Sequence, residues 1–428
     1  MSRTFAHMQI ALGYGRGSLA LDYDESRYRV LAAAAEREES ALTDVEIGAA
    51  IDAPIDSRPL EELVAAGDTA LIVVSDATRA SASAQVVNLL VRRLIELGIT
   101  PRDINIIFAT GLHRPVTAAE KRELLTPFIA QRIKTLDHVA SDSASQVDLG
   151  VTERGTPVLL NRALLEHTHV ILTGSIGFHY FVGFTGGRKS IAPGLAATQT
   201  IEATHMLALD FERGGRRAGV GTGLLDGNIV HEECERIAGR VAPSFLINAV
   251  TDERGRAVRV YAGDWRAAHR RGCAEYTAAH SVEIDARRPV VIAGCGGSPF
   301  DINLIQAHKA LEMASYACAE GGTIIMVAEC ADGLGRADFL KWFAAADSRA
   351  LEERLRSGYE VNGQTAWSLL LKAERFRVVL VSSLADEDAR LMRMSPARTL
   401  AEAMAQVDAQ AEGYIMPRGA ALLPIVAA

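Results

Sequence analysis

Short apolar runs rich in valine and isoleucine recur along this chain and alternate with longer stretches of helical periodicity. The apolar runs lie at 69–76, 104–111, 169–175, 289–294, 322–329 and 377–383. Each has the length and composition of a buried parallel strand. The stretches with helical periodicity lie at 86–98, 302–320 and 350–358. Strand, turn and helix in repetition predict an α/β doubly wound fold, and 428 residues are enough to form it twice.

Charge and hydropathy exclude several classes of protein. The net charge is −8, and lysine and arginine are dispersed rather than clustered, which argues against a nucleic-acid-binding surface. Apolar runs all fall short of the roughly 18 residues that span a bilayer, and the N-terminus lacks the apolar segment of a signal peptide. We therefore expect a cytoplasmic protein that does not bind membranes. The five cysteines include no C-x-x-C pair, so buried free thiols are expected.

Polar residues follow two of the predicted strands directly. The run SDATRAS at 75–81 places Asp76 and Arg79 after the first strand. In open α/β sheets, ligands bind outside the carboxyl ends of the strands, so both residues are site candidates. The planar fork of Arg79 suits a carboxylate or a phosphate. The alternative is a helix start, with Ser75 or Asp76 as N-cap and Arg79 in solvent.

The run FATGLHRP at 108–115 follows the next strand and contributes His113. Pro115 biases Arg114 towards extended backbone, so His113 is predicted to lie on a loop rather than on a helix. A histidine placed this way at a strand end is a candidate for catalysis. A capping or packing role is the alternative.

The segment 174–194, GSIGFHYFVGFTGGRKSIAPG, is dense in glycine and carries His179 and Lys189. Glycine lets backbone approach a ligand closely, so these side chains are predicted to belong to a site. The part GFTGGRKS lacks the spacing of a phosphate-binding P-loop, which argues against a nucleotide triphosphatase. Lys189 instead suits a covalent tether, a Schiff base or an anion contact. A predicted helix follows and carries His205, for which a plain surface position is the alternative.

These motifs together resemble those of one enzyme family. They are D-x-T-R, A-T-G-x-H-R-P, F-H with a lysine inside G-G-R-K-S-I-x-P-G, a histidine sixteen residues after that lysine, and Q-x-x-K in the second half. In this order they resemble the nickel-pincer nucleotide-dependent lactate racemase family. The resemblance runs through both halves of the chain.

The resemblance implies a cofactor and a role for each residue that matches. The cofactor is nickel-pincer nucleotide, a pyridinium-3-thioamide-5-thiocarboxylic acid mononucleotide that holds nickel. Lys189 matches the lysine that tethers it through a thioamide, and Asp76 is expected to bind it. His205 matches the nickel ligand. His113 and His179 match the two acid/base histidines.

The same resemblance implies the residues around the substrate. Arg79, Gln306 and Lys309 match positions that hold the substrate carboxylate and its surroundings, and Trp367 matches an active-site tryptophan. Gln306 and Lys309 are three residues apart on a predicted helix and therefore share a face. For Lys309, a solvated surface position is the alternative that the residues alone favour.

The implied architecture has two α/β domains with mainly parallel sheets and the active site in the cleft between them. Residues 1–270 are expected to form the cofactor-binding domain, and residues 271–428 the domain that closes over the substrate. The polar helical stretch at 265–288 is the predicted hinge.

The implied reaction is racemisation or epimerisation of a 2-hydroxy acid. The hydrogen on Cα is scarcely acidic, because its removal as a proton places negative charge beside a carboxylate. Deprotonation of the hydroxyl instead drives a hydride from Cα to the cofactor and leaves a 2-keto acid, to which the hydride returns on either face. The enantiomers present their hydroxyls differently, so two bases that titrate near neutrality are needed, which suits histidine. A planar nickel centre with one imidazole ligand fits this chemistry.

Two residues depart from the pattern expected of the lactate enzymes and their relatives. Ile305 stands where a tyrosine is expected, and Phe300 where relatives often have a polar residue. The departure predicts a 2-hydroxy acid other than lactate as the preferred substrate. Accessory proteins that make the cofactor are the expected partners.

Two other functions remain open on the sequence. A zinc hydrolase would use His113, His179 and His205 as ligands, although their spacing is not that of H-E-x-x-H. A non-catalytic protein that binds or delivers the nickel nucleotide would retain the same residues and lack turnover.

Overall fold

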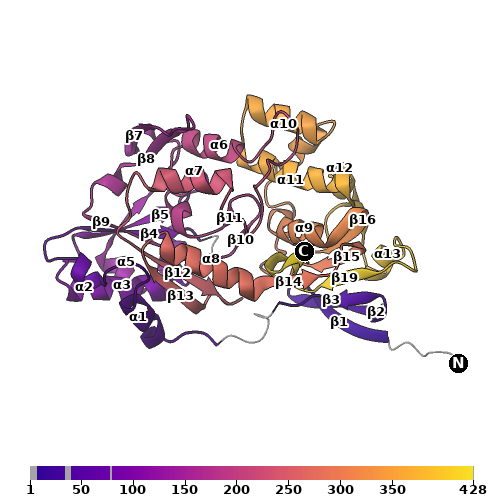
Figure 1. Ribbon diagram of the computed structural model, residues 1–428, viewed down its shortest axis with the longest axis horizontal. Coiled ribbons are helices and arrows are strands. Elements are labelled where there is room, and N and C mark those ends of the chain that lie inside the picture. The colour runs from indigo at the N-terminus through magenta and orange to yellow at the C-terminus, as the bar shows by residue number, and fades with distance from the viewer. Residues whose placement is uncertain (1–6, 34–39, 78–79, 428) are drawn as a thin grey trace. The chain divides into compact units, whose positions relative to one another are not determined.

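The computed structural model describes residues 7–33, 40–77 and 80–427, and Figure 1 labels its elements. These residues form two compact units, each of which is described by itself. Unit 1 comprises 7–33, 209–216 and 279–427, and unit 2 comprises 40–77, 80–208 and 217–278. No helix within these ranges is both long and apolar enough to cross a bilayer.

Unit 2 is built on a six-stranded sheet with the order β13-β12-β9-β4-β5-β6. All neighbours are parallel except β12 and β13. The strands of this sheet are β4 (Ala70–Ser75), β5 (Ile104–Ala109), β6 (Lys134–Asp137), β9 (His169–Ser175), β12 (Phe245–Thr251) and β13 (Ala257–Gly263). Two hairpins accompany it, formed by β7 (Gln146–Val151) with β8 (Pro157–Asn161) and by β10 (Phe178–His179) with β11 (Gly183–Phe184).

The helices of unit 2 follow the strands in the alternation that the sequence predicts. They are α1 (Asp44–Asp52), α2 (Leu60–Leu63), α3 (Ser83–Glu96), α4 (Ala118–Leu124), α5 (Pro127–Arg132), α6 (Thr198–Met206), α7 (Ile229–Ala238) and α8 (Ala267–His280). Short 3-10 turns are η2 (Ser143–Ser145), η3 (Arg162–Leu165) and η4 (Gly187–Ser190).

The sheet of unit 2 is buried on both faces, as the alternating side chains of β4 show. On β4, the side chains of Ala70, Ile72 and Val74 join an apolar core with residues of α1, α2, α3 and α5. Leu71 and Val73 point to the opposite face and are also fully buried. A strand covered on both sides must be apolar throughout, which is why it reads as a continuous valine and isoleucine run.

Unit 1 contains a second six-stranded sheet, with the order β18-β17-β16-β15-β19-β3 and parallel pairing throughout. Its strands are β3 (Tyr28–Val30), β15 (Arg288–Gly294), β16 (Cys318–Val327), β17 (Arg377–Val381), β18 (Ser395–Ala397) and β19 (Gly413–Met416). Two-stranded sheets are formed by β1 (His7–Tyr14) with β2 (Gly17–Asp24) and by β14 (Ser281–Ile284) with β20 (Leu423–Val426).

The helices of unit 1 include the one on which Gln306 and Lys309 lie. They are α9 (Leu304–Ala317), α10 (Ser348–Ser357), α11 (Val361–Arg375), α12 (Asp386–Leu391) and α13 (Leu400–Met404), with the 3-10 turns η5 (Phe339–Ala344) and η6 (Gly419–Ala421). Residues of the β1–β2 hairpin, including Leu12 and Leu21, pack with Leu400 of α13 in one apolar core against the sheet.

The structure confirms the predicted fold class, two α/β units with large, mainly parallel sheets. The six predicted strands are β4, β5, β9, β15, β16 and β17, and the three predicted helices are α3, α9 and α10. All five cysteines are free and buried, as expected.

The bounds of the two units are not those of the expected domains, 1–270 and 271–428. Residue 270 lies inside α8, and unit 2 extends to residue 278. The N-terminal strand β3 pairs with β19, so the start of the chain belongs with the C-terminal unit. The functional roles expected for 1–270 and 271–428 remain predictions.

Candidate active site

The topology of unit 2 brings the sequence motifs to one edge of its sheet. The chain runs from β4 to β5 and β6 on one side, and returns to β9 on the other side of β4. The point between β4 and β9 is therefore a topological switch point, where open α/β sheets bind ligands beyond the carboxyl ends of the strands. The loops that leave β4, β5 and β9 carry Asp76, His113 and the 174–194 segment.

His113 and Asp76 contact each other at this edge. Nδ1 of His113 lies 2.7 Å from Oδ2 of Asp76, and the exposed side-chain fractions are 47% and 7%. Because a carboxylate only accepts, Nδ1 donates and Nε2 retains the lone pair. The arrangement makes Nε2 of His113 the basic nitrogen and holds the ring in place.

Close backbone contact joins the β5 loop to the 174–194 segment. The N–H of Gly111 donates to the carbonyl oxygen of Gly194 at 2.9 Å. A Cβ on Gly194 would lie 2.5 Å from the carbonyl oxygen of Ser190 and 2.8 Å from Cβ of Ala109. Glycine is therefore required at 194, and the contact keeps His113 and Lys189 in neighbouring loops.

His179 lies on the short β10–β11 hairpin. The backbone N–H of Val182 donates to Nδ1 of His179 at 3.4 Å, so the hydrogen of the neutral ring is on Nε2. The Phe181 ring centroid is 4.7 Å from that of His179 and 5.0 Å from that of His205. Phe181 thus contacts both His179 and His205.

His205 is buried in the last turn of α6, with 8% of the residue exposed. The reading of His205 as a surface residue is therefore wrong. Its Nδ1 lies 2.8 Å from the carbonyl oxygen of Ile201, which fixes the hydrogen on Nδ1 and the lone pair on Nε2. Burial, and then the charge of Lys189, lowers the pKa of His205 to about 3. The neutral imidazole has the form that a metal ligand requires.

Lys189 lies in the tight turn η4, and Asn248 of β12 holds that turn. The N–H of Gly187 donates to Oδ1 of Asn248 at 2.8 Å. A Cβ on Gly186 would lie 2.5 Å from the same oxygen, and the φ of Gly186 is +75°. Asn248 is fully buried. Asn248 was not predicted as a site residue from the sequence. A single amide side chain inside an apolar strand indicates a buried hydrogen bond and could have identified it.

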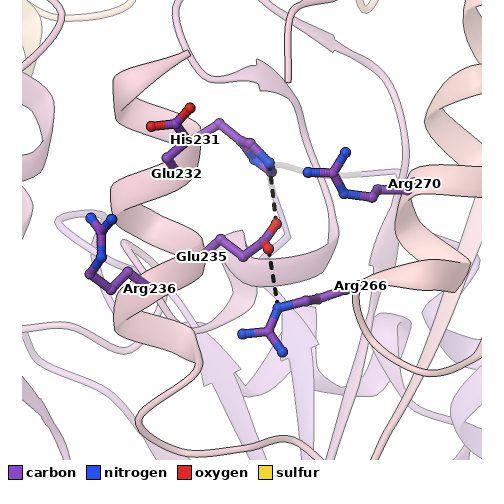
Figure 2. A pocket seen from close by; sticks show the side chains of 6 residues that line it. All are labelled: His231, Glu232, Glu235, Arg236, Arg266 and Arg270. Atoms are coloured by element: carbon purple, nitrogen blue, oxygen red, sulfur yellow. Dashed lines mark hydrogen bonds and ion pairs between the residues drawn. The ribbon is translucent and has the colours of Figure 1, made fainter. Parts of the chain in front are cut away.

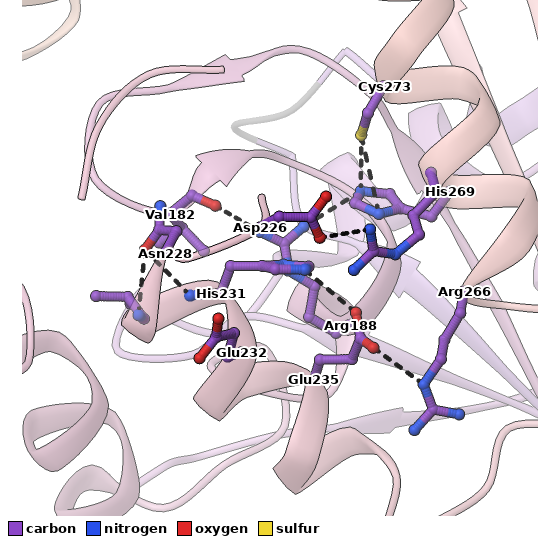
Figure 3. Close-up of polar contacts among 12 residues, drawn as sticks. Val182, Arg188, Asp226, Asn228, His231, Glu232, Glu235, Arg266, His269 and Cys273 are labelled. Atoms are coloured by element: carbon purple, nitrogen blue, oxygen red, sulfur yellow. Dashed lines mark hydrogen bonds and ion pairs between the residues drawn. The ribbon is translucent and has the colours of Figure 1, made fainter. Parts of the chain in front are cut away.

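Arg188, the neighbour of Lys189, is buried and also anchors this turn through its guanidinium (Figure 3). Its guanidinium donates to the carbonyl oxygen of Val182 at 2.7 Å and lies 3.2 Å from Nε2 of His269. Burial lowers the pKa of Arg188. Arg188 was not among the predicted site residues.

The predicted substrate residues of unit 1 lie on α9 and α11. Nζ of Lys309 donates to Oε1 of Gln306 at 2.7 Å, which confirms that they share a face of α9. The indole of Trp367 is fully buried, and its Nε1 donates to Oε1 of Glu352 at 2.9 Å. These contacts give Trp367 a packing role, and its contact with substrate remains a prediction. Arg79 lies outside the described residues.

The three histidines do not gather as a zinc cluster. Among the residues that the structure describes, there is no group of three or more histidine, cysteine or acidic side chains that could hold a metal ion. This distribution disfavours the zinc hydrolase that the sequence left open.

Comparison with known proteins assigns the family. The model of the lactate racemase N-terminal domain matches residues 14–215, and that of the lactate racemase C-terminal domain matches residues 284–421. A lactate racemase from Lactiplantibacillus plantarum is 32% identical over 406 residues, which cover 92% of this chain and 93% of that protein.

The chain belongs to the lactate racemase family. Its members are racemases, and this chain is accordingly an isomerase. A lactate racemase from Thermoanaerobacterium thermosaccharolyticum is 28% identical over 403 residues, covering 92% of this chain and 93% of the relative.

Solved structures agree with this assignment. The lactate racemase apoprotein of Thermoanaerobacterium thermosaccharolyticum matches with a TM-score of 0.88 at 28% identity, covering 98% of this chain and 100% of that one. A Thermotoga maritima protein matches with a TM-score of 0.67 at 18% identity over 91% of this chain and 100% of its own, which shows the fold alone. The resemblance drawn from the motifs is confirmed at the level of the lactate racemase family.

Proposed function

We propose that this enzyme racemises or epimerises a 2-hydroxy acid through a 2-keto acid, with nickel-pincer nucleotide as its cofactor. The observation that carries the proposal is the pair of histidines with opposite protonation. His113 presents a basic Nε2 because Asp76 accepts from its Nδ1, whereas His179 carries its hydrogen on Nε2 because Nδ1 accepts from Val182. A racemase of this kind needs one group to take a hydroxyl proton and another to return one.

The donor set of unit 2 fits the proposed cofactor. His205 is buried, neutral and oriented by Ile201, so that its Nε2 lone pair suits nickel. Lys189 lies close enough to lower the pKa of His205, and it is only partly buried, so that its amine can be reached for a covalent thioamide. Asp76 is proposed to contribute to cofactor binding from the adjacent loop.

When bound, the cofactor supplies an electron-poor carbon that accepts hydrogen from the substrate Cα as a hydride. The side chains of this chain supply the rest. His113 removes the hydroxyl proton of one enantiomer through Nε2, and His179 serves the other. Asp76 accepts from Nδ1 of His113 throughout and keeps the ring in the basic tautomer.

Binding of the substrate carboxylate is proposed for Arg79, Gln306 and Lys309. The contact between Lys309 and Gln306 supports a joint role, because it orients the ammonium group on one face of α9. Arg79 would supply a second positive charge for the carboxylate. Lactate is the substrate named for the relatives, and we propose a 2-hydroxy acid of the same class here.

Two further parts of the proposal concern the cell. Accessory proteins that synthesise the nickel nucleotide are the proposed partners, because a cofactor of this complexity needs its own biosynthesis. We also propose a cytoplasmic location, which the buried free thiols support, since thiols stay reduced there.

The test follows the hydrogen on Cα. Enzyme co-expressed with the cofactor-making proteins is incubated with one enantiomer of 2-deuterated 2-hydroxy acid in ordinary water, and the products are separated by chiral chromatography. Hydride transfer predicts that the opposite enantiomer appears with deuterium retained. Loss of deuterium to solvent would indicate proton abstraction. The absence of turnover with every 2-hydroxy acid tested would indicate a non-catalytic protein that binds or delivers the nickel nucleotide.

A further inference from the structure

A hollow of about 260 Å³ opens between α7 and α8 of unit 2. Figure 2 shows the six side chains that line it: His231, Glu232, Glu235, Arg236, Arg266 and Arg270. None of them has a role in the proposed reaction. The hollow is lined by three arginines, two glutamates and one histidine. What it could bind depends on which of their polar atoms already have partners.

Glu235 has both carboxylate oxygens engaged. Its Oε1 accepts from Nε of Arg266 at 3.1 Å, and its Oε2 lies 3.2 Å from Nε2 of His231 (Figure 2). The contact with His231 lowers the pKa of Glu235 to about 2. This carboxylate is therefore charged.

Both carboxylate oxygens of Glu232 accept hydrogen bonds from groups outside the hollow. Its Oε2 accepts from Arg154 at 2.9 Å, and its Oε1 accepts from the backbone N–H of Gly227 at 3.1 Å. Each carboxylate oxygen of these two side chains thus already has a polar contact within the protein.

The arginines, by contrast, retain donors. Each guanidinium has five N–H groups. Within the described residues, Arg266 uses only Nε, towards Glu235, and Arg270 uses only Nη1, which donates to Asp226 at 2.7 Å. Figure 2 shows the guanidinium of Arg270 directed towards His231. Most donors of these two forks have no protein acceptor in that part of the chain.

A fourth arginine lies near the hollow. Arg188 lies fully buried behind it and hydrogen-bonds to carbonyl oxygens and His269, with no carboxylate among its hydrogen-bond partners in the described ranges. Burial first, and then the charges of Arg188 and Arg270, lower the pKa of His231 despite Glu235. His231 is 1% exposed, and neither of its ring nitrogens has a hydrogen-bond partner among the described residues, although Nε2 lies 3.2 Å from Oε2 of Glu235.

We propose that this hollow binds a small oxyanion, either inorganic phosphate or the phosphate group of a monoester, through the forks of Arg266 and Arg270. Phosphate offers several acceptor oxygens in a geometry that arginine forks match. It supplies acceptors that the hollow lacks, because Arg266 and Arg270 have more guanidinium donors than the acceptors that contact them. The site lies outside the proposed chemistry and does not depend on it.

The test uses the full chain without cofactor and titrates it calorimetrically with inorganic phosphate at constant ionic strength. The double variant Arg266→Gln/Arg270→Gln removes both forks. The matched control Arg271→Gln/Arg256→Gln removes the same charge, and both control residues lie outside the hollow, with side chains 67% and 52% exposed. Thermal unfolding of each variant establishes that it is folded.

Saturable phosphate binding is expected in the wild type and in the control. In the fork variant, affinity should fall at least about tenfold, because charge-assisted hydrogen bonds are the stronger class. Arg270→Lys keeps the charge and loses the fork, and it should weaken binding as well. A parallel titration with ribose 5-phosphate separates the two sources, since tighter binding than inorganic phosphate assigns a monoester.

Two results would overturn the proposal. One is no saturable binding of either phosphate compound by the wild type at millimolar concentration. The other is an equal loss of affinity in the fork variant and the control, which would mean that net charge alone attracts the anion. Neither result bears on racemase activity, so this inference and the proposed function fail separately.

Discussion

Oδ2 of Asp76 lies 2.7 Å from Nδ1 of His113, across two loops that leave adjacent parallel strands. The aspartate is buried and the histidine is half exposed, so the carboxylate orients a ring whose other nitrogen is accessible to a ligand. The two residues are 37 apart in the sequence, and the sheet alone brings them together.

This relationship predicts graded losses of activity. His113→Ala should slow racemisation by roughly 10²–10⁴-fold, the usual contribution of a placed proton-transfer group. Asp76→Asn should slow it by about 10–100-fold, because the ring remains but its tautomer is no longer fixed. Initial rates in both directions, on protein of equal nickel content, measure these effects. Near-normal turnover in His113→Ala would make that histidine merely structural.

His205 should determine nickel content. We expect His205→Gln to lose nickel while it keeps its fold, because the glutamine amide can replace the contact with Ile201 but offers no imidazole nitrogen. His138→Gln is the matched control, since His138 is also buried in unit 2 and contacts Ala196 and Asn161 instead. Metal analysis of both purified variants decides the point. Equal nickel in the two would remove His205 from the metal site.

The burial of His205 also predicts a pH dependence of stability. Its folded pKa of about 3 lies below the ordinary value of 6.5, so the neutral ring stabilises the fold above pH 6.5. This contribution is lost as the pH falls from 6.5 towards 3, by up to about 1.4 kcal/mol per pH unit. His205→Gln should therefore show a shallower fall in the free energy of unfolding below pH 6.5. Urea unfolding of cofactor-free protein at several pH values measures the slope, and identical slopes would refute it.

Ile305 should shift substrate preference. An apolar side chain at a position where the lactate enzymes are expected to have a phenol removes a hydrogen-bond partner near the substrate. We expect a larger 2-hydroxy acid, aliphatic or carboxylated, to exceed lactate by at least about tenfold in kcat/KM. A panel of enantiopure lactate, 2-hydroxybutyrate, malate, phenyllactate and gluconate tests this, with Ile305→Tyr as the variant expected to regain lactate. Lactate as the best substrate of the unaltered enzyme would contradict the role of Ile305.

Three strands of each six-stranded sheet could be predicted, namely β4, β5, β9, β15, β16 and β17, because each contains an apolar run that is buried on both faces. Leu71, Ile72 and Val73 are all fully buried, and a run of this kind is visible without knowledge of its neighbours. The site motifs were equally visible, because glycine and polar residues interrupt the apolar pattern at the strand ends.

What could not be predicted depends on contacts between distant segments. The pairing of β3 with β19 joins residues near 28 and 413, and no local pattern records it. The segment 209–216 joins unit 1 through Arg216, which donates to Glu312 at 2.6 Å. The role of Asn248 likewise requires knowing that β12 lies beside β9, from whose end the glycine turn begins.

The tether at Lys189 is the part of the proposed function that one measurement tests most directly. Intact mass spectrometry under denaturing conditions is applied to protein co-expressed with the cofactor-making proteins, with Lys189→Ala as the control. We expect an added mass equal to the nucleotide on the wild type and none on the variant, because Lys189 in η4 is only partly buried and its amine can be reached for thioamide formation. Fully active wild-type protein that shows only the unmodified mass would contradict it.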